Sequence, residues 1–166
     1  MKKYTACVGS TVYNEKNQLV AKDVNFNLPA VTYQTVEFKA LGTVEIPVPQ
    51  LIDAMEATVT HIGEDAGFLK SLTPGSRKIE ARWARSVIDE NGNAKTVGCR
   101  AAMTVMSKGI PEIGVSVGET TEIELPLAVT RYRLYVDGAE VLLVDKMKGI
   151  CRINGKDYAG DVSSVL

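Results

Sequence analysis

The sequence predicts a mainly β protein: an antiparallel β-sandwich or partial barrel with one short flanking α-helix, in a single domain covering residues 1–166. Three observations support this class. Two turns, Asn91-Gly92 and Asp137-Gly138, are each flanked by strand-forming residues, which is typical of β-hairpins. The chain reads as about seven to nine strands. Only residues 64–72 have a helical pattern, and no heptad or short repeat is present.

The hairpin over residues 121–152 is the strongest element. Asp137-Gly138 favours a two-residue turn, because a type I′ turn needs φ > 0 at both central positions. The predicted pairs on its apolar face are Val136–Ala139, Leu134–Val141 and Tyr132–Leu143. The opposite face is mixed and partly charged, with Tyr135 near Glu140 and with Arg131 and Arg133. A slip of one residue would bury these arginines, so the register is well specified.

A second hairpin is predicted from Arg77–Asp89 and Ala94–Lys108, around Asn91-Gly92. Tight pairing predicts Val87–Thr96, Arg85–Gly98, Trp83–Arg100 and Ala81–Ala102, with a possible cation–π contact between Trp83 and Arg100. Small and polar residues dominate both faces of this hairpin. That composition suits a sheet with one face in water.

Residues 31–51 combine apolar side chains with Gly42, Pro47 and Pro49. The segment is too interrupted for a central strand and too apolar for a solvated linker. Two interpretations stay open: a mobile loop, or an arm that packs on another chain, since exposed apolar patches usually mark interaction surfaces. The residues that would make the contact are Val36, Phe38, Leu41, Gly42, Val44 and Ile46.

The remaining elements are shorter. Strands are expected at Tyr4–Tyr13, Gln18–Leu28 and Ala54–Ile62, and a helix at Glu64–Leu72 that needs a sheet to pack on. Residues 149–166 hold one more strand, Ile150–Ile153, followed by an Asn-Gly turn and a polar tail.

Composition excludes several classes of function. The 19 basic and 20 acidic residues give a net charge of −1 without strong segregation along the chain, which argues against sequence-independent gripping of nucleic acid. The three widely spaced cysteines indicate free thiols in a reducing compartment. No apolar run follows Lys2 and Lys3, so we expect no export signal there, and no stretch approaches the ~20 apolar residues of a membrane span.

The sequence offers little chemistry. His61, the single histidine, lies in a strand pattern and is more often structural there than catalytic. Cys99 could be a nucleophile, but no base is placed beside it. Nucleotide, dinucleotide, hydrolase and metalloprotease motifs are absent from the sequence. We therefore expect no enzyme, no cofactor and no metal site.

Two ordered stretches resemble a known family. Residues 19–63 (LVAKDVNFNLPAVTYQTVEFKALGTVEIPVPQLIDAMEATVTHIG) contain a strand ending in Leu-Pro, a long segment with a glycine and a Met-Glu-Ala strand. Residues 125–157 (LPLAVTRYRLYVDGAEVLLVDKMKGICRINGKD) contain a tyrosine-bearing strand, an Asp-Gly turn, a strand ending at Asp145 and an Asn-Gly. With the arginine–aromatic step Arg82-Trp83 between them, they resemble the major tail tube proteins of contractile-tailed phages. That family usually ends in a short helical tail, and the final AGDVSSVL departs from this pattern.

The resemblance implies a subunit of stacked hexameric rings whose strands join into one continuous β-barrel around a lumen. It implies that residues 31–51 form an inter-ring loop, and that the second hairpin, with Arg82, Trp83, Arg85 and Arg100, contributes to the barrel wall. The 64–72 helix would lie outside. A lumen that passes DNA must not hold it tightly, so we expect no strongly basic lining.

The implied partners are copies of the chain itself, the tail sheath protein, the baseplate tube initiator, the tape measure protein and the tail terminator. DNA or other cargo would pass through, without membrane insertion by this chain. The implied location is the virion tail, with synthesis and assembly in the host cytoplasm. Bacteriocin and type VI secretion tubes share this architecture, so the kind of particle stays open. Two rival hypotheses remain: a monomeric β-barrel that binds a small molecule, and an enzyme that uses Cys99 or His61.

Overall fold

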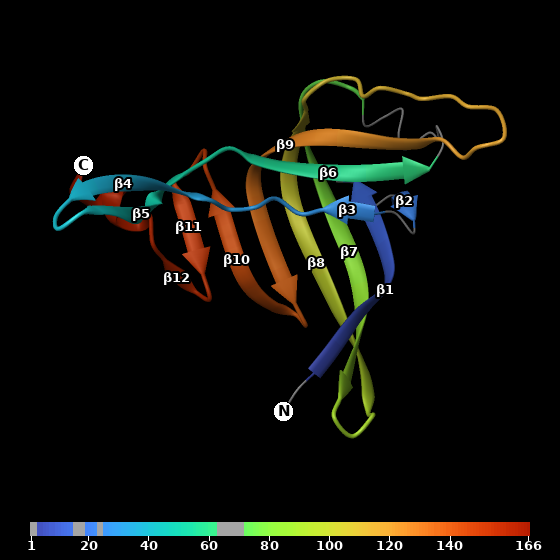
Figure 1. Cartoon of the computed structure of the whole chain (residues 1–166), viewed down its shortest axis with the longest axis horizontal. Helices are drawn as coiled ribbons and strands as arrows, with labels where there is room; N and C mark the ends of the chain where they lie inside the picture. Colours follow the sequence, from blue (N-terminus) through green and yellow to red (C-terminus); the bar gives the residue numbers. More distant parts are fainter. Residues whose placement is uncertain (1–2, 15–18, 23–24, 63–71) are drawn as a thin grey trace.

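The computed structural model describes residues 3–14, 19–22, 25–62 and 72–166, and these are mostly antiparallel β-strands (Figure 1). A large sheet has the strand order β12-β11-β10-β9-β8-β7-β1-β2, with β6 on β9 and β3 on β6, while β4 and β5 pair only with each other. The bounds are β1 Lys3–Asn14, β2 Leu19–Lys22, β3 Asn25–Asn27, β4 Tyr33–Lys39, β5 Thr43–Ile52, β6 Met55–Ile62, β7 Ser76–Asp89, β8 Ala94–Ser107, β9 Glu122–Val136, β10 Ala139–Asp145, β11 Ile150–Ile153, β12 Lys156–Asp157 and α2 Gly160–Val165.

The long strand β9 links two layers. Its first half pairs with β6, from Glu122 to Val129, and its second half pairs with β10, from Arg131 to Val136. The β3–β6 layer therefore crosses over one face of the sheet that runs from β1 to β11 (Figure 1). The described strands form a two-layered open structure and no closed barrel, so the isolated subunit corresponds to the sandwich form of the prediction.

The core lies between these layers and is built from alternate residues of each strand. Ile123, Leu125 and Val105 are among the largest fully buried side chains. Apolar residues fill it because alternate side chains of a strand point to one face. The main contributors are Val12, Met55, Ala57, Val59, Ile79, Ala81, Ala101, Met103, Leu127, Val129, Tyr132, Val144 and Cys151.

The Asp137-Gly138 hairpin forms as predicted at its turn, and Ala139 pairs with Val136. The predicted pairs further along are wrong: Leu142, not Val141, lies opposite Leu134, and Val144, not Leu143, lies opposite Tyr132. The reason is a β-bulge at Val141, which inserts one extra residue into β10. Because of it, Asp145 and Arg131 lie opposite each other and form an ion pair with an N–O distance of 3.9 Å.

The second hairpin exists with the predicted extent but with a register shifted by one residue. Trp83 lies opposite Cys99, Arg85 opposite Val97, Ala81 opposite Ala101 and Ser86 opposite Thr96. The Asp89 carboxylate accepts the backbone N–H groups of Asn91 and Asn93, which closes a three-residue loop with Gly92 at φ 79°. The two-residue turn was therefore wrong, and so was the contact between Trp83 and Arg100: Arg100 lies opposite Arg82 and over the Tyr135 ring.

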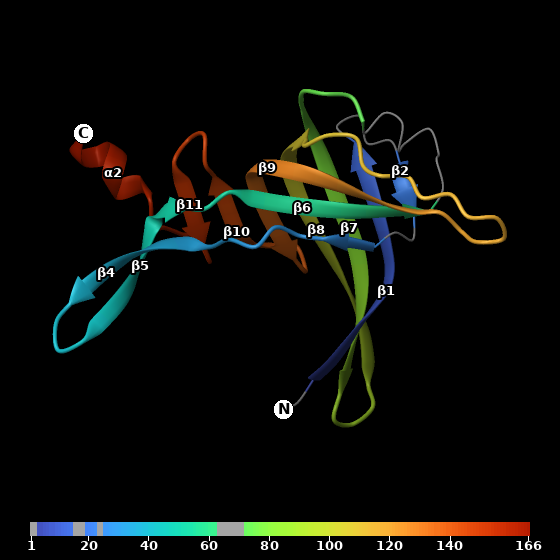
Figure 2. The same cartoon turned by 45° about the horizontal axis from the view of Figure 1, so that its top comes forward.

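Residues 33–52 form a β-hairpin rather than a loop. Strands β4 and β5 pair from Tyr33–Ile52 to Lys39–Thr43, and the turn places Leu41 and Gly42 at positive φ. Figure 2 shows this hairpin projecting beyond the sheet near α2. We call it the arm. Its base is held by Tyr33 and Ile52, which pack against the core.

Three other predictions need comment. The strand expected at Gln18–Leu28 is wrong as one unit, because β2 pairs with β1 and β3 pairs with β6. The helix expected at Glu64–Leu72 lies outside the described residues, except for Leu72, which packs on the core. The chain ends in a short helix, α2, despite the departure noted in the sequence. Among the described helices, none has the length and apolar character needed to cross a membrane.

Candidate assembly surfaces

The arm gathers exposed apolar side chains on one face. Val36 lies opposite Ile46, and Phe38 lies opposite Val44, so the four side chains point to the same side. All four are exposed, Phe38 by 52%, and Leu41 is fully exposed at the tip. The structure therefore brings together the six residues that the sequence analysis singled out in this segment.

The other face of the arm is polar. Glu37 lies directly opposite Glu45, and both are exposed. Like charges at directly opposite positions of a β-ladder destabilise the pair. The described residues place no cation in an ion pair with either glutamate. The arm is thus amphipathic, with an apolar face and a charged one that carries Glu37, Glu45 and Lys39.

A second projection is formed by the ends of three strands. Strand β9 pairs with β8 only from Cys99 onward, so the residues of β8 before that point extend past β9. In this extension β7 is the middle strand: its residues Arg85–Asp89 pair with Ala94–Val97 of β8 on one side and with Lys3–Cys7 of β1 on the other. We call this three-stranded extension the flap; it carries the hairpin tip seen at the lower end in Figure 1. Tyr4 is 63% exposed on it, and Val8, the next residue of β1 after the flap, is 64% exposed.

The face of the large sheet turned away from the β3–β6 layer is lined with arginines. Arg82 and Arg100 come from the second hairpin, and Arg131, Arg133 and Arg152 come from β9 and β11. The carboxylates of Glu80, Glu140 and Asp145 pair with these arginines at N–O distances of 2.5 to 3.9 Å. Lys78 adds a sixth cation, so this polar face has more cations than carboxylates among its described side chains.

Aromatic rings fix two of these guanidinium groups. Arg82 lies 4.2 Å from the centroid of the Tyr13 ring, and Arg100 lies 4.1 Å from that of Tyr135. A hydrogen bond to Glu80 raises the pKa of Arg82, and a hydrogen bond to Glu140 raises the pKa of Arg133. The polar face is therefore a network of charges in fixed positions.

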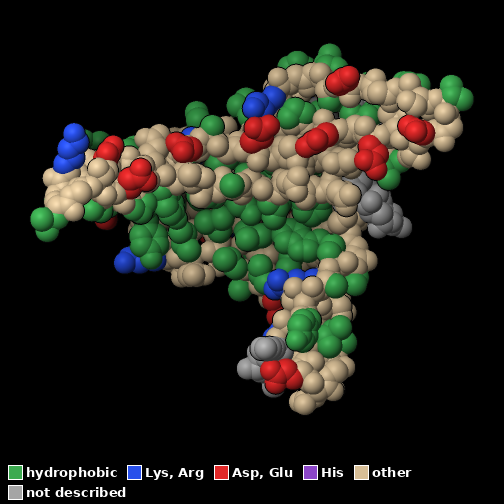
Figure 3. All heavy atoms as spheres, viewed as in Figure 1, with side chains coloured by type: hydrophobic (Ala, Val, Ile, Leu, Met, Phe, Trp, Pro, Cys, Tyr) green, Lys and Arg blue, Asp and Glu red, His purple; other side chains and the backbone are tan. Residues whose placement is uncertain are grey.

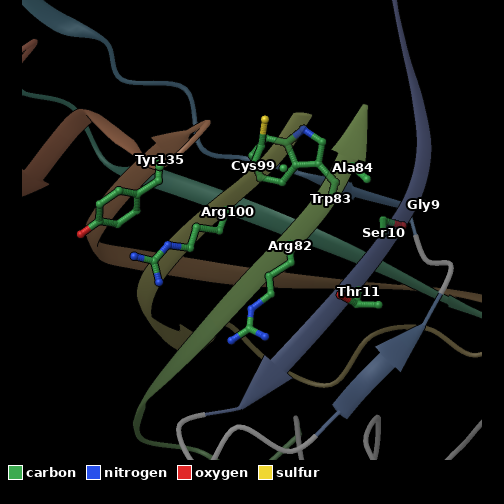
Figure 4. A pocket seen from close by; sticks show the side chains of 11 residues that line it. Gly9, Ser10, Thr11, Arg82, Trp83, Ala84, Cys99, Arg100 and Tyr135 are labelled. Carbon is green, nitrogen blue, oxygen red and sulfur yellow. The ribbon is translucent and has the colours of Figure 1, made fainter. Parts of the chain in front are cut away.

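A hollow of about 620 Å³ opens over the β7–β8 hairpin (Figure 4). Its lining includes the small residues Gly9, Ala84 and Gly98, with Arg82 and Arg100 beside them. Trp83 and Cys99 also line the hollow. The Trp83 side chain lies on the other face of β7 from Arg82, and its ring packs edge to face on Phe26 at 5.7 Å. Arg85 shares the side of Trp83, because residues two apart in a strand point the same way. Of the four residues expected in the barrel wall, only Arg82 and Arg100 reach the polar face.

The outer face of the β3–β6 layer is acidic. Glu56 on β6 and Glu122 and Glu124 on β9 are exposed there, and Figure 3 shows acidic side chains in a row along this layer. Lys108 pairs with Glu56 at 3.2 Å. The two faces of the subunit thus differ in charge, although the sequence shows no segregation along its length.

The connection between β8 and β9 carries further exposed apolar side chains. Ile110, Val115 and Val117 are all strongly exposed. This connection extends at the opposite end of the molecule from the arm (Figure 1). The sequence analysis did not single out this connection, and its closely spaced apolar residues were the signal that could have revealed it.

The candidates for catalysis are core residues. His61 is 2% exposed, and Cys99 is buried beside Trp83 in the hairpin. No group of histidine, cysteine and acidic residues able to hold a metal ion occurs in the part of the chain that the structure describes. The gap beside His61 measures about 20 Å³, far below the roughly 300 Å³ of a small-molecule pocket.

The fold and its surfaces define a class of protein. An exposed apolar hairpin, free strand edges and two faces of different charge are typical of a subunit that assembles with other chains. The chain matches the family of phage tail tube protein FII over residues 8–166 and belongs to that family. It is therefore a structural protein of the tail tube, located in the tail, and not an enzyme.

Solved structures give two further comparisons. One is the sheath-tube complex of the extracellular contractile injection system PVC in its extended state, with 11% identity, a TM-score of 0.49 and coverage of 76% of this chain and 87% of that chain. The other is the sheath/tube terminator of PVC in its extended state, with 13% identity, a TM-score of 0.44 and coverage of 76% and 92%. No curated protein matches the sequence.

Proposed function

We propose that copies of this chain assemble into hexameric rings that stack into the inner tube of a contractile tail. DNA or another cargo passes through the bore. The single observation that carries the proposal is the arm, whose face of Val36, Phe38, Val44 and Ile46 is exposed and lies well away from the core. An isolated two-stranded hairpin is only marginally stable, and exposed apolar patches usually mark interaction surfaces. We therefore expect the apolar face of the arm to pack against another ring.

The two charged faces support an orientation within the tube. The polar face, which includes Arg82 and Arg100, would line the bore, since a wide closed barrel encloses water rather than a packed interior. Its cations are largely paired with carboxylates, which keeps its hold on passing DNA weak. The acidic outer face, with Glu56, Glu122 and Glu124, would face the tail sheath.

The remaining proposed partners follow from this tube. The baseplate initiator would begin the stack, the tape measure protein would lie in the bore, and the terminator would cap the last ring. Assembly would take place in the host cytoplasm. Free strand edges support ring closure, because open edges are a liability unless another strand covers them.

The test is removal of the arm from the full chain. Deletion of Thr35–Glu45 is expected to leave a folded subunit, because the arm pairs only with itself and its base residues Tyr33 and Ile52 remain. Negative-stain images should show tubes for the wild-type protein and none for the deletion variant, with unchanged circular dichroism of the main sheet.

A point variant and a matched control sharpen this test. Phe38→Ser removes one exposed apolar side chain of the arm (52% exposed), and Met147→Ser removes an even more exposed one (81%) from the β10–β11 turn. We expect sedimentation to show shorter or fewer tubes only for Phe38→Ser. Long tubes from the deletion variant would refute the role of the arm, and a strictly monomeric wild-type protein at high concentration would refute tube formation.

A further inference from the structure

We infer that the arm joins a second copy of this chain by strand addition: the free edge of β4 in one copy pairs with the free edge of β1 in the flap of the next. This inference rests on the proposed self-assembly and goes beyond it by naming the two strands. The occupant of the flap edge is thus a defined segment, Tyr33–Lys39, of another copy.

Strand β4 is the edge of the arm that can still form a ladder. Each arm strand pairs only with the other, so each has one unpaired side among the described residues. The edge of β5 contains Pro47 and Pro49, which lack a backbone N–H and interrupt pairing. Strand β4 has no proline over its seven residues. The arm therefore offers one competent edge.

Strand β1 offers the matching edge. It pairs with β7 from Lys3 to Asn14, but β2 covers its other side only at Thr11–Tyr13. The described structure leaves the side of Lys3–Val8 without a strand, and this six-residue stretch is close in length to β4. The edge of β8 on the opposite margin of the flap is shorter, since β9 pairs with β8 from Cys99 onward.

The side chains of the two edges are complementary. Tyr4 and Val8 are exposed apolar residues on β1, as Val36 and Phe38 are on β4. The charged residue of the free β1 stretch is Lys3. Strand β4 carries Glu37, which already faces Glu45 across the arm, and Lys39 at its end, which pairs with Thr43. A lysine on the other side of β4 would relieve this repulsion.

A single copy cannot make this contact with itself. The arm and the flap leave the body in different directions in both cartoon views (Figures 1 and 2). The pairing is therefore head-to-tail between copies, and contacts of this kind close into rings or extend into stacks.

The experiment uses Cys7 as a probe within β1, because it is exposed while Cys99 and Cys151 are buried. Gln34→Cys, Thr35→Cys and Val36→Cys are made one at a time in the full chain, assembled and mildly oxidised, because antiparallel pairing of Glu37 with Lys3 places Cys7 opposite Tyr33 and next to these positions. A disulfide needs its two Cα atoms within about 7 Å, which neighbouring strands provide. At least one variant should give covalently linked multimers on a non-reducing gel, and all linkage should vanish in a Cys7→Ser background.

The matched control is Ile46→Cys, which places the thiol directly opposite residue 36 on the proline-bearing strand, at a similar exposure. Weak linkage of this variant supports the inference. Tubes that form normally, while no β4 cysteine links to Cys7 above this control, would overturn the pairing and leave the tube function standing. Absence of tubes from the wild-type chain would overturn both.

A second measurement uses the unmodified sequence. Labelling of Cys7 by a maleimide should slow by about tenfold or more in tubes relative to separated subunits, as protection beneath a paired strand requires. Equal labelling rates would contradict the inference. Charge reversal adds specificity: Glu37→Lys should reduce assembly, and Lys3→Glu in the same chain should restore it. Failure of that rescue, with unchanged Cys7 reactivity, would count against β1 as the recipient strand.

Discussion

Arg82 and Arg100 lie directly opposite each other on β7 and β8, and both point to the same carboxylate oxygen of Glu80, at 2.5 Å and 3.9 Å. Two like charges at opposite positions of a ladder repel each other, so their shared anion makes this arrangement tolerable. The polar face therefore depends on Glu80 more than on any single arginine of the hairpin.

Replacement of Glu80 by glutamine should expose this repulsion. We expect Glu80→Gln to lower the free energy of unfolding by about 1 kcal/mol, since partly exposed ion pairs contribute up to that amount. Urea unfolding at low and high salt measures it, and the loss should shrink at high salt because screening weakens the repulsion. Glu119→Gln, on the exposed β8–β9 connection, is the control and should change little. An equal loss for both variants would contradict the shared-anion explanation.

The tip of the arm stores backbone strain at Leu41, whose φ is 50°. A left-handed conformation costs a residue with a Cβ about 1–2 kcal/mol, and asparagine tolerates it better. We expect Leu41→Asn to raise the thermal stability of the separated subunit slightly while it reduces tube formation, because the exposed side chain is lost. Calorimetry and sedimentation report the two effects. Unchanged assembly would show that the tip leucine makes no contact between rings.

Asp157 organises the start of the C-terminal helix. Its carboxylate accepts N–H bonds from Ala159, Gly160 and Cys151, and the bond from Ala159 is the main cause that holds its pKa below the usual range. A carboxylate with a lowered pKa in the folded state stabilises above its unfolded pKa, and this contribution is lost as pH falls through the folded value.

Acidification should therefore loosen α2 before it unfolds the sheet. We expect amide exchange at Gly160 to accelerate below about pH 4, the ordinary aspartate range, while amides of β8 stay protected. In Asp157→Asn this acid step should be absent. Hydrogen exchange followed by NMR makes the comparison. A pH-independent exchange rate at Gly160 in the wild-type protein would contradict the role of the carboxylate.

A buried and an exposed isoleucine allow the core and the surface to be compared. Ile123 is 0% exposed on β9, where it pairs with His61 of β6, and Ile110 is 78% exposed on the β8–β9 connection. Ile123→Ala should cost about 2–5 kcal/mol of unfolding free energy in the subunit, as buried truncations do. Ile110→Ala should cost less than about 0.5 kcal/mol there. Chemical denaturation of unassembled protein measures both, and similar losses would contradict the described layers.

The sequence predicted the class of fold because the strand patterns and glycine turns are local signals. It did not predict registers, since these depend on non-local details. The extra residue at Val141 and the carboxylate of Asp89 each shifted a hairpin by one position, and a shift of one residue moves side chains to the other face. That is why Trp83 was expected beside Arg100 and lies against Phe26 instead.

The candidate surfaces were predicted in part. The apolar residues of the arm all lie within one short segment of the sequence, so their exposure could be suspected from composition. The polar face was harder, because it combines Arg82 with Arg133 and Arg152 from strands distant in the sequence. The sequence indicated only one part of the polar face, namely the mixed face of the 121–152 hairpin with Arg131, Arg133 and Tyr135. The opposition of Glu37 and Glu45 needed the arm register, which no local pattern gives.

The prolines on β5 have a consequence for the time before assembly. A hairpin whose two edge strands could both pair with other strands would add copies on either side, and newly made subunits would aggregate. Because Pro47 and Pro49 lie on β5, only the β4 edge of the arm can pair fully with another strand. Under the inferred β4–β1 pairing, growth has one direction, and separate subunits add only to an end that exposes the recipient strand.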